Sequence, residues 1–290
     1  MVITYLVFGT DNSNYGQAIF SILSFLSQTN DNDKVAVVSD HPEKFSFLSD
    51  RIIVIGINEE KLTEWKGKYQ FFWRVKIKTL QLVTSKYENH SILYLDSDTF
   101  LFGSLDRIKS CLDEGINLMH TNEGKLSKLA SKTERKMWSQ VKNRDYAGIT
   151  IDPDTCMWNA GVVAVSHKNI DKLDLALDIC DSMCAEKVTP RLIEQFAFSV
   201  AMGAGVRLIA AENEIGHYWG NKGMWNNKIQ DFIYDSYMNG LSIDEQIDKV
   251  KNTEFNKIPV NIKSSNTKKR LNNTISKIFP DKYAVYIPNK

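Results

Sequence analysis

Two carboxylates separated by one serine stand directly after an apolar run, in the sequence ILYLDSD of residues 92–98. The run is typical of a buried parallel strand, because it is too short for an isolated helix. A strand that ends in acid places those acids at the carboxyl edge of a sheet, where open α/β folds bind their ligands. Asp96 and Asp98 repel each other at this spacing, and a divalent cation would relieve the repulsion. The segment predicts either a metal site or an ordinary Asp-rich turn.

A second polar cluster, GTDNSNY at residues 9–15, follows the first apolar run of the chain. Thr10, Asp11 and Asn12 have short polar side chains that could hydrogen-bond a base or a ribose. Tyr15 could stack on a base. The alternative interpretation is a strand-to-helix turn in which an aspartate or serine caps the helix.

Two later segments carry further candidate groups. Asn159, in the sequence WNAGVV, offers a donor and an acceptor at a sheet edge, although the segment could also be a simple turn. His217 opens the sequence HYWGNKGMW, and histidine binds Mn²⁺-type metals alongside carboxylates. In the same segment, Gly220 would let the backbone approach a phosphate and Lys222 would supply a positive charge. The alternative is an aromatic-rich loop packed on the core.

The elements that must position these groups alternate between strands and helices. Strands are expected at residues 2–8, 35–38, 52–57, 92–95, 116–120, 161–165 and 206–210. Helices are expected at residues 15–28, 71–87, 105–112, 125–144, 169–185 and 190–202. Such alternation indicates an α/β fold with a mostly parallel central sheet and helices on both faces. We expect one main domain at residues 1–250, followed by a basic tail with a small helical extension at residues 251–290.

The overall composition is that of an ordinary globular protein, with 43% apolar and 24% charged residues. The 36 basic and 35 acidic residues nearly cancel, which argues against a nucleic-acid partner. The start of the chain is interpreted as a first strand rather than a signal peptide, and no apolar run approaches the roughly 18 residues needed to span a bilayer. The four cysteines are expected to be reduced thiols. These features predict a cytoplasmic protein.

The tail from Lys251 to Lys290 differs from the rest, with nine lysines or arginines against two acids. Its basic stretch is followed by apolar positions that could form a short hydrophobic face: Leu271, Ile275, Ile278 and Phe279. The tail is interpreted either as a solvated surface helix or as a peripheral attachment to an anionic membrane surface, such as the inner membrane face.

Taken in order, these motifs resemble family-8 glycosyltransferases, which include glycogenin and bacterial lipopolysaccharide galactosyl- and glucosyltransferases. The resemblance covers residues 1 to about 225. It is carried by TDNxxY from residue 10, LDSDT from 95, NAGV from 159, Glu194-Gln195, and HxxGxK from 217. It implies a GT-A fold, in which a Rossmann-like nucleotide-binding sheet merges with an acceptor-binding part. It also implies transfer of a hexose from a UDP-sugar with retention, using Mn²⁺ or Mg²⁺.

The resemblance implies roles residue by residue. Asp96, Asp98 and His217 would hold the metal, and Ser97 would lie near the ribose. Other residues would bind the nucleotide-sugar: Thr10, Asp11, Asn12 and Tyr15 at the nucleotide, Gly220 and Lys222 at the diphosphate, Lys78 or alternatively Arg74 towards the donor, and Asn159, Glu194 and Gln195 at the transferred sugar. The chain departs from the family pattern in two places: the segment after Gly220 is one residue shorter and lacks a proline, and Glu194 replaces the usual aspartate.

The residues themselves agree with transfer from a sugar diphosphate. Breaking that bond leaves extra negative charge, which a metal and a lysine would stabilise electrostatically. Retention requires either a nucleophile on the far face of the sugar or a front-face route. Glu194 is chemically capable of attack and Gln195 is a poor nucleophile, and we favour the front-face route. Two alternatives stay open: a non-catalytic nucleotide-sugar-binding protein and an Asp-x-Asp phosphatase, for which Phe100 is an unexpected residue.

The sequence indicates the acceptor substrate less clearly than the donor. A glycan or glycolipid of the cell surface would suit the predicted location. Residues 125–144 and the loop 146–158 are where the resemblance places acceptor binding, with Trp138, Tyr146 and Trp158 as candidate stacking residues.

Overall fold

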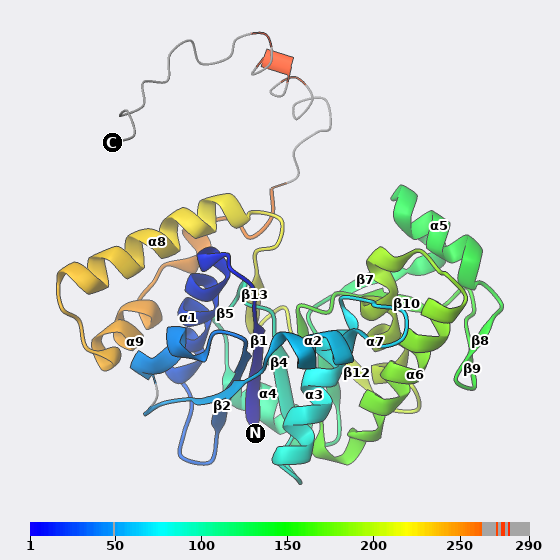
Figure 1. Ribbon diagram of the computed structural model, residues 1–290, viewed down its shortest axis with the longest axis horizontal. Coiled ribbons are helices and arrows are strands. Elements are labelled where there is room, and N and C mark those ends of the chain that lie inside the picture. The colour runs from blue at the N-terminus through cyan, green and yellow to red at the C-terminus, as the bar shows by residue number, and fades with distance from the viewer. Residues whose placement is uncertain (49, 263–270, 272–273, 276–277, 279–290) are drawn as a thin grey trace.

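A seven-stranded sheet forms the centre of the protein, seen in a computed structural model that describes residues 1–48, 50–262, 271, 274–275 and 278 (Figure 1). Its strand order is β12-β6-β11-β4-β1-β2-β3. The strands are β1 (Val2–Val7), β2 (Lys34–Ser39), β3 (Ile53–Gly56), β4 (Ile92–Leu95), β6 (Asn117–Met119), β11 (Val162–Val165) and β12 (Leu208–Ala210). Only β11 runs antiparallel to its neighbours β4 and β6 within this sheet. The predicted α/β fold with a mostly parallel sheet is therefore confirmed.

Two layers of helices cover the two faces of the sheet. One layer contains α1 (Asn12–Leu26), α4 (Leu105–Asp113), α8 (Lys222–Met238) and α9 (Ile243–Lys251). The other contains α2 (Glu59–Lys66), α3 (Arg74–Lys86), α6 (Asp171–Ala185) and α7 (Ile193–Gly203). Strand β1 contributes Val2 and Leu6 to one core and Ile3, Tyr5 and Val7 to the other. Side chains alternate across a strand, so a continuous apolar run fits a sheet that is buried on both faces.

Three short antiparallel pairs lie outside the central sheet. Strand β5 (Thr99–Leu101) pairs with β13 (Ile215–His217), and β7 (Asn122–Lys125) pairs with β10 (Cys156–Trp158). Strand β8 (Asp145–Tyr146) forms a small hairpin with β9 (Ile149–Thr150). Short 3₁₀ helices connect the elements: η1 (Pro42–Leu48), η2 (Leu126–Lys128), η3 (His167–Asn169), η4 (Pro190–Leu192) and η5 (Phe255–Lys257). The β5–β13 pair has the greatest consequence for function, because it joins the segment after β4 to the segment around residue 217.

The structure corrects several predicted elements. The helix predicted at residues 125–144 is only α5 (Lys132–Val141), because the residues before it form β7 and η2. Its start is fixed by a capping box between Ser131 and Glu134, a short signal that the longer polar pattern hides. Helix α2 and strands β5 and β13 were not predicted from the sequence. The helix predicted at 190–202 begins as η4 and continues as α7.

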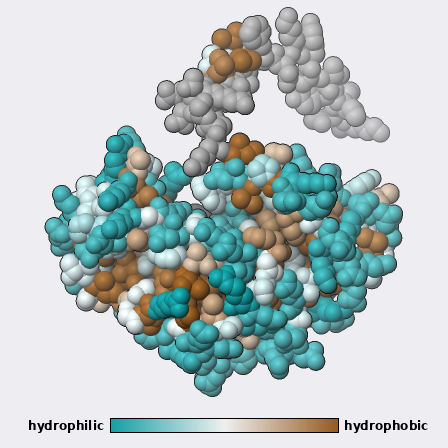
Figure 2. All heavy atoms as spheres, turned by 180° about the vertical axis from the view of Figure 1, so that it is seen from behind, coloured by the Kyte–Doolittle hydropathy of each residue, from teal (hydrophilic) through white to brown (hydrophobic). Residues whose placement is uncertain are grey.

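The surface is mainly hydrophilic, with apolar residues gathered in a few patches on the face shown in Figure 2. None of the described helices is long and apolar enough to cross a membrane. The four cysteines are free thiols. Residues 263–270 and 279, on which much of the predicted membrane attachment rests, lie outside the described residues, so that attachment stays a prediction.

Candidate metal and nucleotide-sugar site

A cleft of about 710 Å³ opens at the carboxyl ends of β1 and β4. Its floor includes Phe8 after β1, Asp96 and Asp98 after β4, and Gly161 before β11. The N-terminal ends of α3, α5 and α7 form its walls. This is the sheet edge at which the strand-then-acid pattern placed a ligand site.

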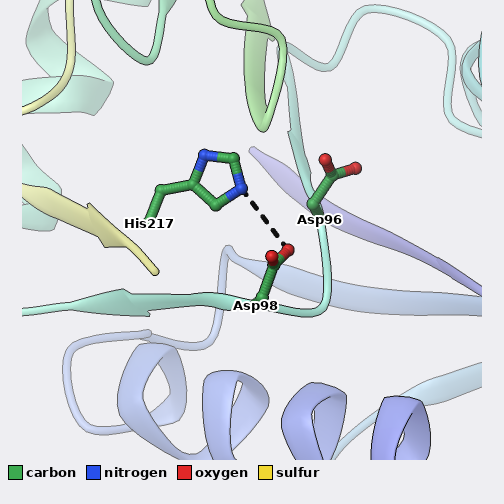
Figure 3. Close-up of side chains that lie close together, drawn as sticks. All are labelled: Asp96, Asp98 and His217. Carbon is green, nitrogen blue, oxygen red and sulfur yellow. Dashed lines mark ion pairs between the residues drawn. The ribbon is translucent and has the colours of Figure 1, made fainter. Parts of the chain in front are cut away.

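Asp96, Asp98 and His217 lie together in this cleft (Figure 3). One potential ligand atom from each side chain lies within 4.8 Å of the other two. The register of β5 with β13 pairs His217 with Thr99, which brings the histidine beside Asp98. His217 Nε2 lies 3.4 Å from Asp98 Oδ1. The structure thus unites three residues that the sequence predicted as metal ligands, two of them more than a hundred positions from the third.

A hydrogen bond holds the ring of His217. Asn159 Oδ1 accepts a bond from the Gly161 amide at 3.0 Å and lies 3.0 Å from His217 Nδ1. Since that oxygen can only accept, Nδ1 carries a proton, and Nε2 is the ring nitrogen that faces Asp98. A Cβ atom on Gly161 would lie 2.1 Å from the imidazole, so glycine is required for the ring to stand there. The segment from Asn159 to Gly161 therefore builds a socket for His217.

A second histidine packs against the first. The rings of His120 and His217 are perpendicular, with centroids 5.1 Å apart, and His120 Nε2 lies 3.2 Å from the carbonyl oxygen of Ile215. Burial, reinforced by the charge of His217, lowers the pKa of His120 to about 4. His120 therefore stays neutral near pH 7 and contributes packing without charge. It was not predicted from the sequence.

Asp98 is 3% exposed and has two cationic or proton-donating neighbours. Lys222 Nζ lies 2.9 Å from its Oδ2, opposite the oxygen that faces His217. Burial opposes the charge of this carboxylate, but the hydrogen bond with His217 and the charge of Lys222 outweigh it and hold the pKa of Asp98 well below its ordinary value. Asp98 is therefore ionised and ready to bind a cation.

On the opposite side of the site, Lys76 supports Asp96. Its ammonium lies 3.1 Å from Asp96 Oδ1 and 2.9 Å from Glu194 Oε1, and it donates to the carbonyl of Ala160 at 3.1 Å. Tyr94 also donates its hydroxyl to Asp96 Oδ1 at 3.0 Å. Burial disfavours the charge of Lys76, but the two carboxylates prevail and raise its pKa above the ordinary value. A permanent cation therefore lies between a metal-ligand candidate and Glu194.

The predicted basic residues of α3 lie elsewhere. Lys78 Nζ donates to Gln81, and Arg74 binds Asp181 through two nitrogens, at 2.7 and 2.9 Å. Neither is among the described residues that line the cleft. Lys76 takes the place expected for them. A signal was present, because position 76 falls on the buried stripe of α3 that continues through Leu80 and Val83.

Two of the three predicted sugar-facing residues, Asn159 and Gln195, are joined through one carboxylate. Glu123, which the sequence did not single out, accepts from Asn159 Nδ2 at 3.3 Å and from Gln195 Nε2 at 2.8 Å. Burial raises the pKa of Glu123, and the two amide hydrogen bonds oppose that rise. Glu194 follows the same pattern: burial raises its pKa, and Lys76 opposes the rise. These carboxyl and amide groups line the cleft beside the metal-ligand candidates.

The predicted nucleotide-binding turn is mostly occupied with local structure. Asp11 accepts the Ser13 amide as the N-cap of α1, and Asn12 accepts from Lys44 Nζ. Tyr15 is buried, donates its hydroxyl to Gly9 O and Asp40, and has Lys44 over its ring at 3.9 Å. Thr10, Asp11, Asn12 and Tyr15 are not among the described residues lining the cleft, whereas Ser97 and Asn14 are. Base stacking on Tyr15 would require Lys44 to move.

The exposed aromatic rings of the cleft also differ from the candidates. Trp138, Tyr146 and Trp158 are not among its described lining residues. Phe72, Trp73 and Trp219 line it instead, and they are 40%, 48% and 54% exposed. Phe72 packs against Phe8 and Trp73, so the rim at the start of α3 is an aromatic cluster. The sequence signal was the FFW triplet directly before α3.

No family model and no curated protein sequence matches the chain. Among solved structures, it is similar to the galactosyltransferase LgtC in complex with donor and acceptor sugar analogues, with 15% identity, 72% of this chain and 73% of that chain covered, and a TM-score of 0.47. It is also similar to mouse xyloside xylosyltransferase 1 (11% identity, 72% and 83% covered, TM-score 0.48). A third similar structure is the glycosyltransferase GlyE of Streptococcus pneumoniae TIGR4 (15% identity, 98% and 66% covered, TM-score 0.45). At these TM-scores, the function of this chain has to be inferred from its own residues.

Proposed function

We propose that this chain is a metal-dependent glycosyltransferase that moves a hexose from a nucleotide-sugar, expected to be a UDP-sugar, to a glycan or glycolipid acceptor with retention. One observation carries the proposal: Asp96, Asp98 and His217 converge in a large cleft, with the ammonium of Lys222 on the same site. Two carboxylates, an imidazole and a lysine form a set that would bind a cation together with an anionic diphosphate.

The donor atoms fit a divalent transition metal. Carboxylate oxygens suit Mn²⁺ and Mg²⁺ alike, whereas an imidazole nitrogen favours Mn²⁺ over Mg²⁺. The hydrogen bond that His217 Nδ1 donates to Asn159 Oδ1 leaves Nε2 as the ring nitrogen that would bind metal. Asp96, Asp98 and His217 would hold this ion, and when bound it would neutralise charge on the departing diphosphate.

Lys222 would bind the diphosphate directly. Its side chain is 48% exposed, although its partner Asp98 is almost fully buried. Because the lysine is half exposed, its ammonium can move from Asp98 to a phosphate oxygen. A positive charge that meets the leaving group lowers the barrier to cleavage of the sugar–phosphate bond.

The transferred sugar would lie against Asn159, Glu194 and Gln195. Carboxyl and amide groups on the cleft wall are suited to hydroxyl recognition. The ion pair between Glu194 and Lys76 makes the Glu194 carboxylate a weaker nucleophile, since attack would have to separate the buried pair. This supports front-face transfer assisted by the diphosphate. Detection of a sugar covalently bound to Glu194 by mass spectrometry would contradict it.

The acceptor would use the aromatic rim of the cleft. Exposed rings such as Trp73 and Trp219 present flat apolar faces on which a sugar can stack. We infer a cytoplasmic enzyme of cell-surface polysaccharide synthesis, in peripheral contact with the membrane through its basic tail. Flotation with anionic vesicles, compared with neutral ones, tests the membrane contact.

Isothermal titration of UDP and UDP-hexoses, with and without Mn²⁺, tests the function itself. We expect nucleotide binding that depends on the metal and slow release of UDP from one of the sugars. NMR of the sugar product at early times reports retention or inversion. Metal-dependent binding without any turnover, with a panel of glycan acceptors present, would favour a non-catalytic nucleotide-sugar-binding protein. An absence of metal-dependent binding would contradict the proposal.

A further inference from the structure

A short C-terminal segment, residues 259–262, runs beside the loop that carries Lys222, and we call it the strap. Asn261 of the strap forms a parallel bridge with Gly220, and the Ile262 amide donates to Gly220 O at 3.5 Å. The strap carbonyl of Pro259 accepts Asn221 Nδ2 at 2.6 Å and Trp225 Nε1 at 3.2 Å. The strap therefore touches the residues on both sides of Lys222.

Asn221 is diverted from its usual local role. It is the N-cap of α8, where an asparagine side chain normally accepts a backbone amide of the first turn. The side chain of Asn221 makes no such bond, and its amide group donates to Pro259 instead. The residue is 8% exposed. The side chain at the start of α8 therefore holds a distant segment and does not cap its own helix.

The contact with the strap also explains why residue 220 is a glycine. A Cβ atom there would lie 2.4 Å from Asn261 Oδ1, so the glycine allows the strap to approach. At the beginning of the same loop, the Tyr218 amide donates to Asp98 O at 3.0 Å. The loop is thus fixed at one end to Asp98, between β4 and β5, and at the other end to the strap. Lys222, which reaches Asp98, follows directly after these two anchors.

We propose that Asn221 and Asn261 are positioning residues, which act through Lys222 to set the affinity of the site for a nucleoside diphosphate. The inference rests on the proposed function, because it takes the diphosphate as the partner of Lys222. The strap fixes the loop backbone, and the fixed backbone fixes the point from which the lysine extends. Asn221 and Asn261 themselves would not touch the nucleotide.

The test is a double-mutant cycle on UDP affinity in the presence of Mn²⁺. Asn221→Ser keeps a residue that can cap α8 but is too short to reach Pro259, and Asn261→Ala removes the side chain that packs on Gly220. We expect each variant to bind UDP about tenfold more weakly than wild type, with little change in melting temperature. In a Lys222→Ala background, we expect the same changes to have no further effect. Equal losses in both backgrounds would overturn the inference, as would wild-type affinity in the strap variants.

A second measurement separates failure of this inference from failure of the proposed function. Amine labelling followed by mass spectrometry reports how strongly Lys222 is held, with Lys228 on the same helix as the internal reference, and it needs no ligand. We expect labelling of Lys222 to rise several-fold in Asn221→Ser and Asn261→Ala, since the ion pair with Asp98 protects the amine only while its geometry is held. If wild type binds no UDP, the proposed function fails, and the labelling still decides the role of the strap. Unchanged labelling would overturn it.

Discussion

The two carboxylates of the candidate metal site are compensated in opposite ways. Asp96 is paired with Lys76, a side chain 8% exposed on a helix of the core, whereas Asp98 is paired with Lys222, a side chain 48% exposed at the end of a loop. A buried pair is costly to break, and an exposed pair contributes little. The Lys76–Asp96 pair is therefore a fixed part of the structure, whereas Lys222 can leave Asp98 for another partner.

Replacing Lys76 by methionine should have the largest effect on stability. The change would leave Asp96 and Glu194 as neighbouring carboxylates without their cation, and breaking such a buried group typically costs about 3–5 kcal/mol. Urea denaturation measures the loss. Lys78→Met on the same helix is the matched control, and we expect it to cost less than about 1 kcal/mol. Adding Glu194→Gln to Lys76→Met should recover part of the loss. Wild-type stability in Lys76→Met would show that the Lys76–Asp96 pair is no more costly to break than the Lys222–Asp98 pair.

Replacing Asp98 by asparagine should affect metal binding most. Loss of a direct ligand should weaken Mn²⁺ binding by more than the roughly 10–100-fold that supporting residues contribute. Titration followed by electron paramagnetic resonance of free Mn²⁺ measures the change. Asp106→Asn, at an exposed position of α4, is the control. An unchanged Mn²⁺ affinity in Asp98→Asn would show that Asp98 is not a ligand, and the contrast with Asp96 would lose its functional meaning.

Replacing Gly161 by alanine tests whether the socket of His217 matters as much as its ligand atom. The new Cβ would overlap the imidazole, so the ring must turn away from Asp98 and Mn²⁺ affinity should fall about tenfold. Gly223→Ala is the matched control, because no atom lies within 4 Å of its added Cβ. Equal Mn²⁺ affinities in the two variants would mean that His217 is not held by this socket.

The sequence predicted the Asp96 and Asp98 pair and its place in the fold for a physical reason. A strand buried on both faces must be apolar along its whole length, and in a parallel sheet such a run ends where ligands bind. The meeting of Asp98 with His217 depends on the pairing of β5 with β13, two strands of three residues each. Strands so short carry no periodic signal, so the histidine was indicated by its ligand chemistry and by the order of motifs along the chain, and not by a predicted strand pair.

Two residues, Tyr15 and Lys76, have side chains whose type is compatible with two environments. Tyr15 has the aromatic ring of a stacking residue, but helix periodicity places that ring in the core, where Phe45 lies 5.8 Å away. Lys76 has the charge of a surface residue, but it occupies the buried face of α3. In each case the position within the helix stripe decided the environment, and the chemical type of the residue was the weaker guide.

Replacing Lys222 by alanine should change Mn²⁺ affinity less than the other substitutions do. It is also the substitution that tests most directly whether Lys222 exchanges partners. Lys222 and a bound cation would compete for the negative charge of Asp98, so loss of the lysine should strengthen binding of Mn²⁺ alone. We expect a gain of no more than about fivefold, because the lysine end of the pair is half exposed. Binding of UDP with Mn²⁺ should weaken, since the diphosphate would lose a cationic partner. Lys228→Ala, further along α8, is the control. The two opposite changes in one variant would identify Lys222 as an exchangeable partner, because a merely structural lysine would shift both affinities in the same direction.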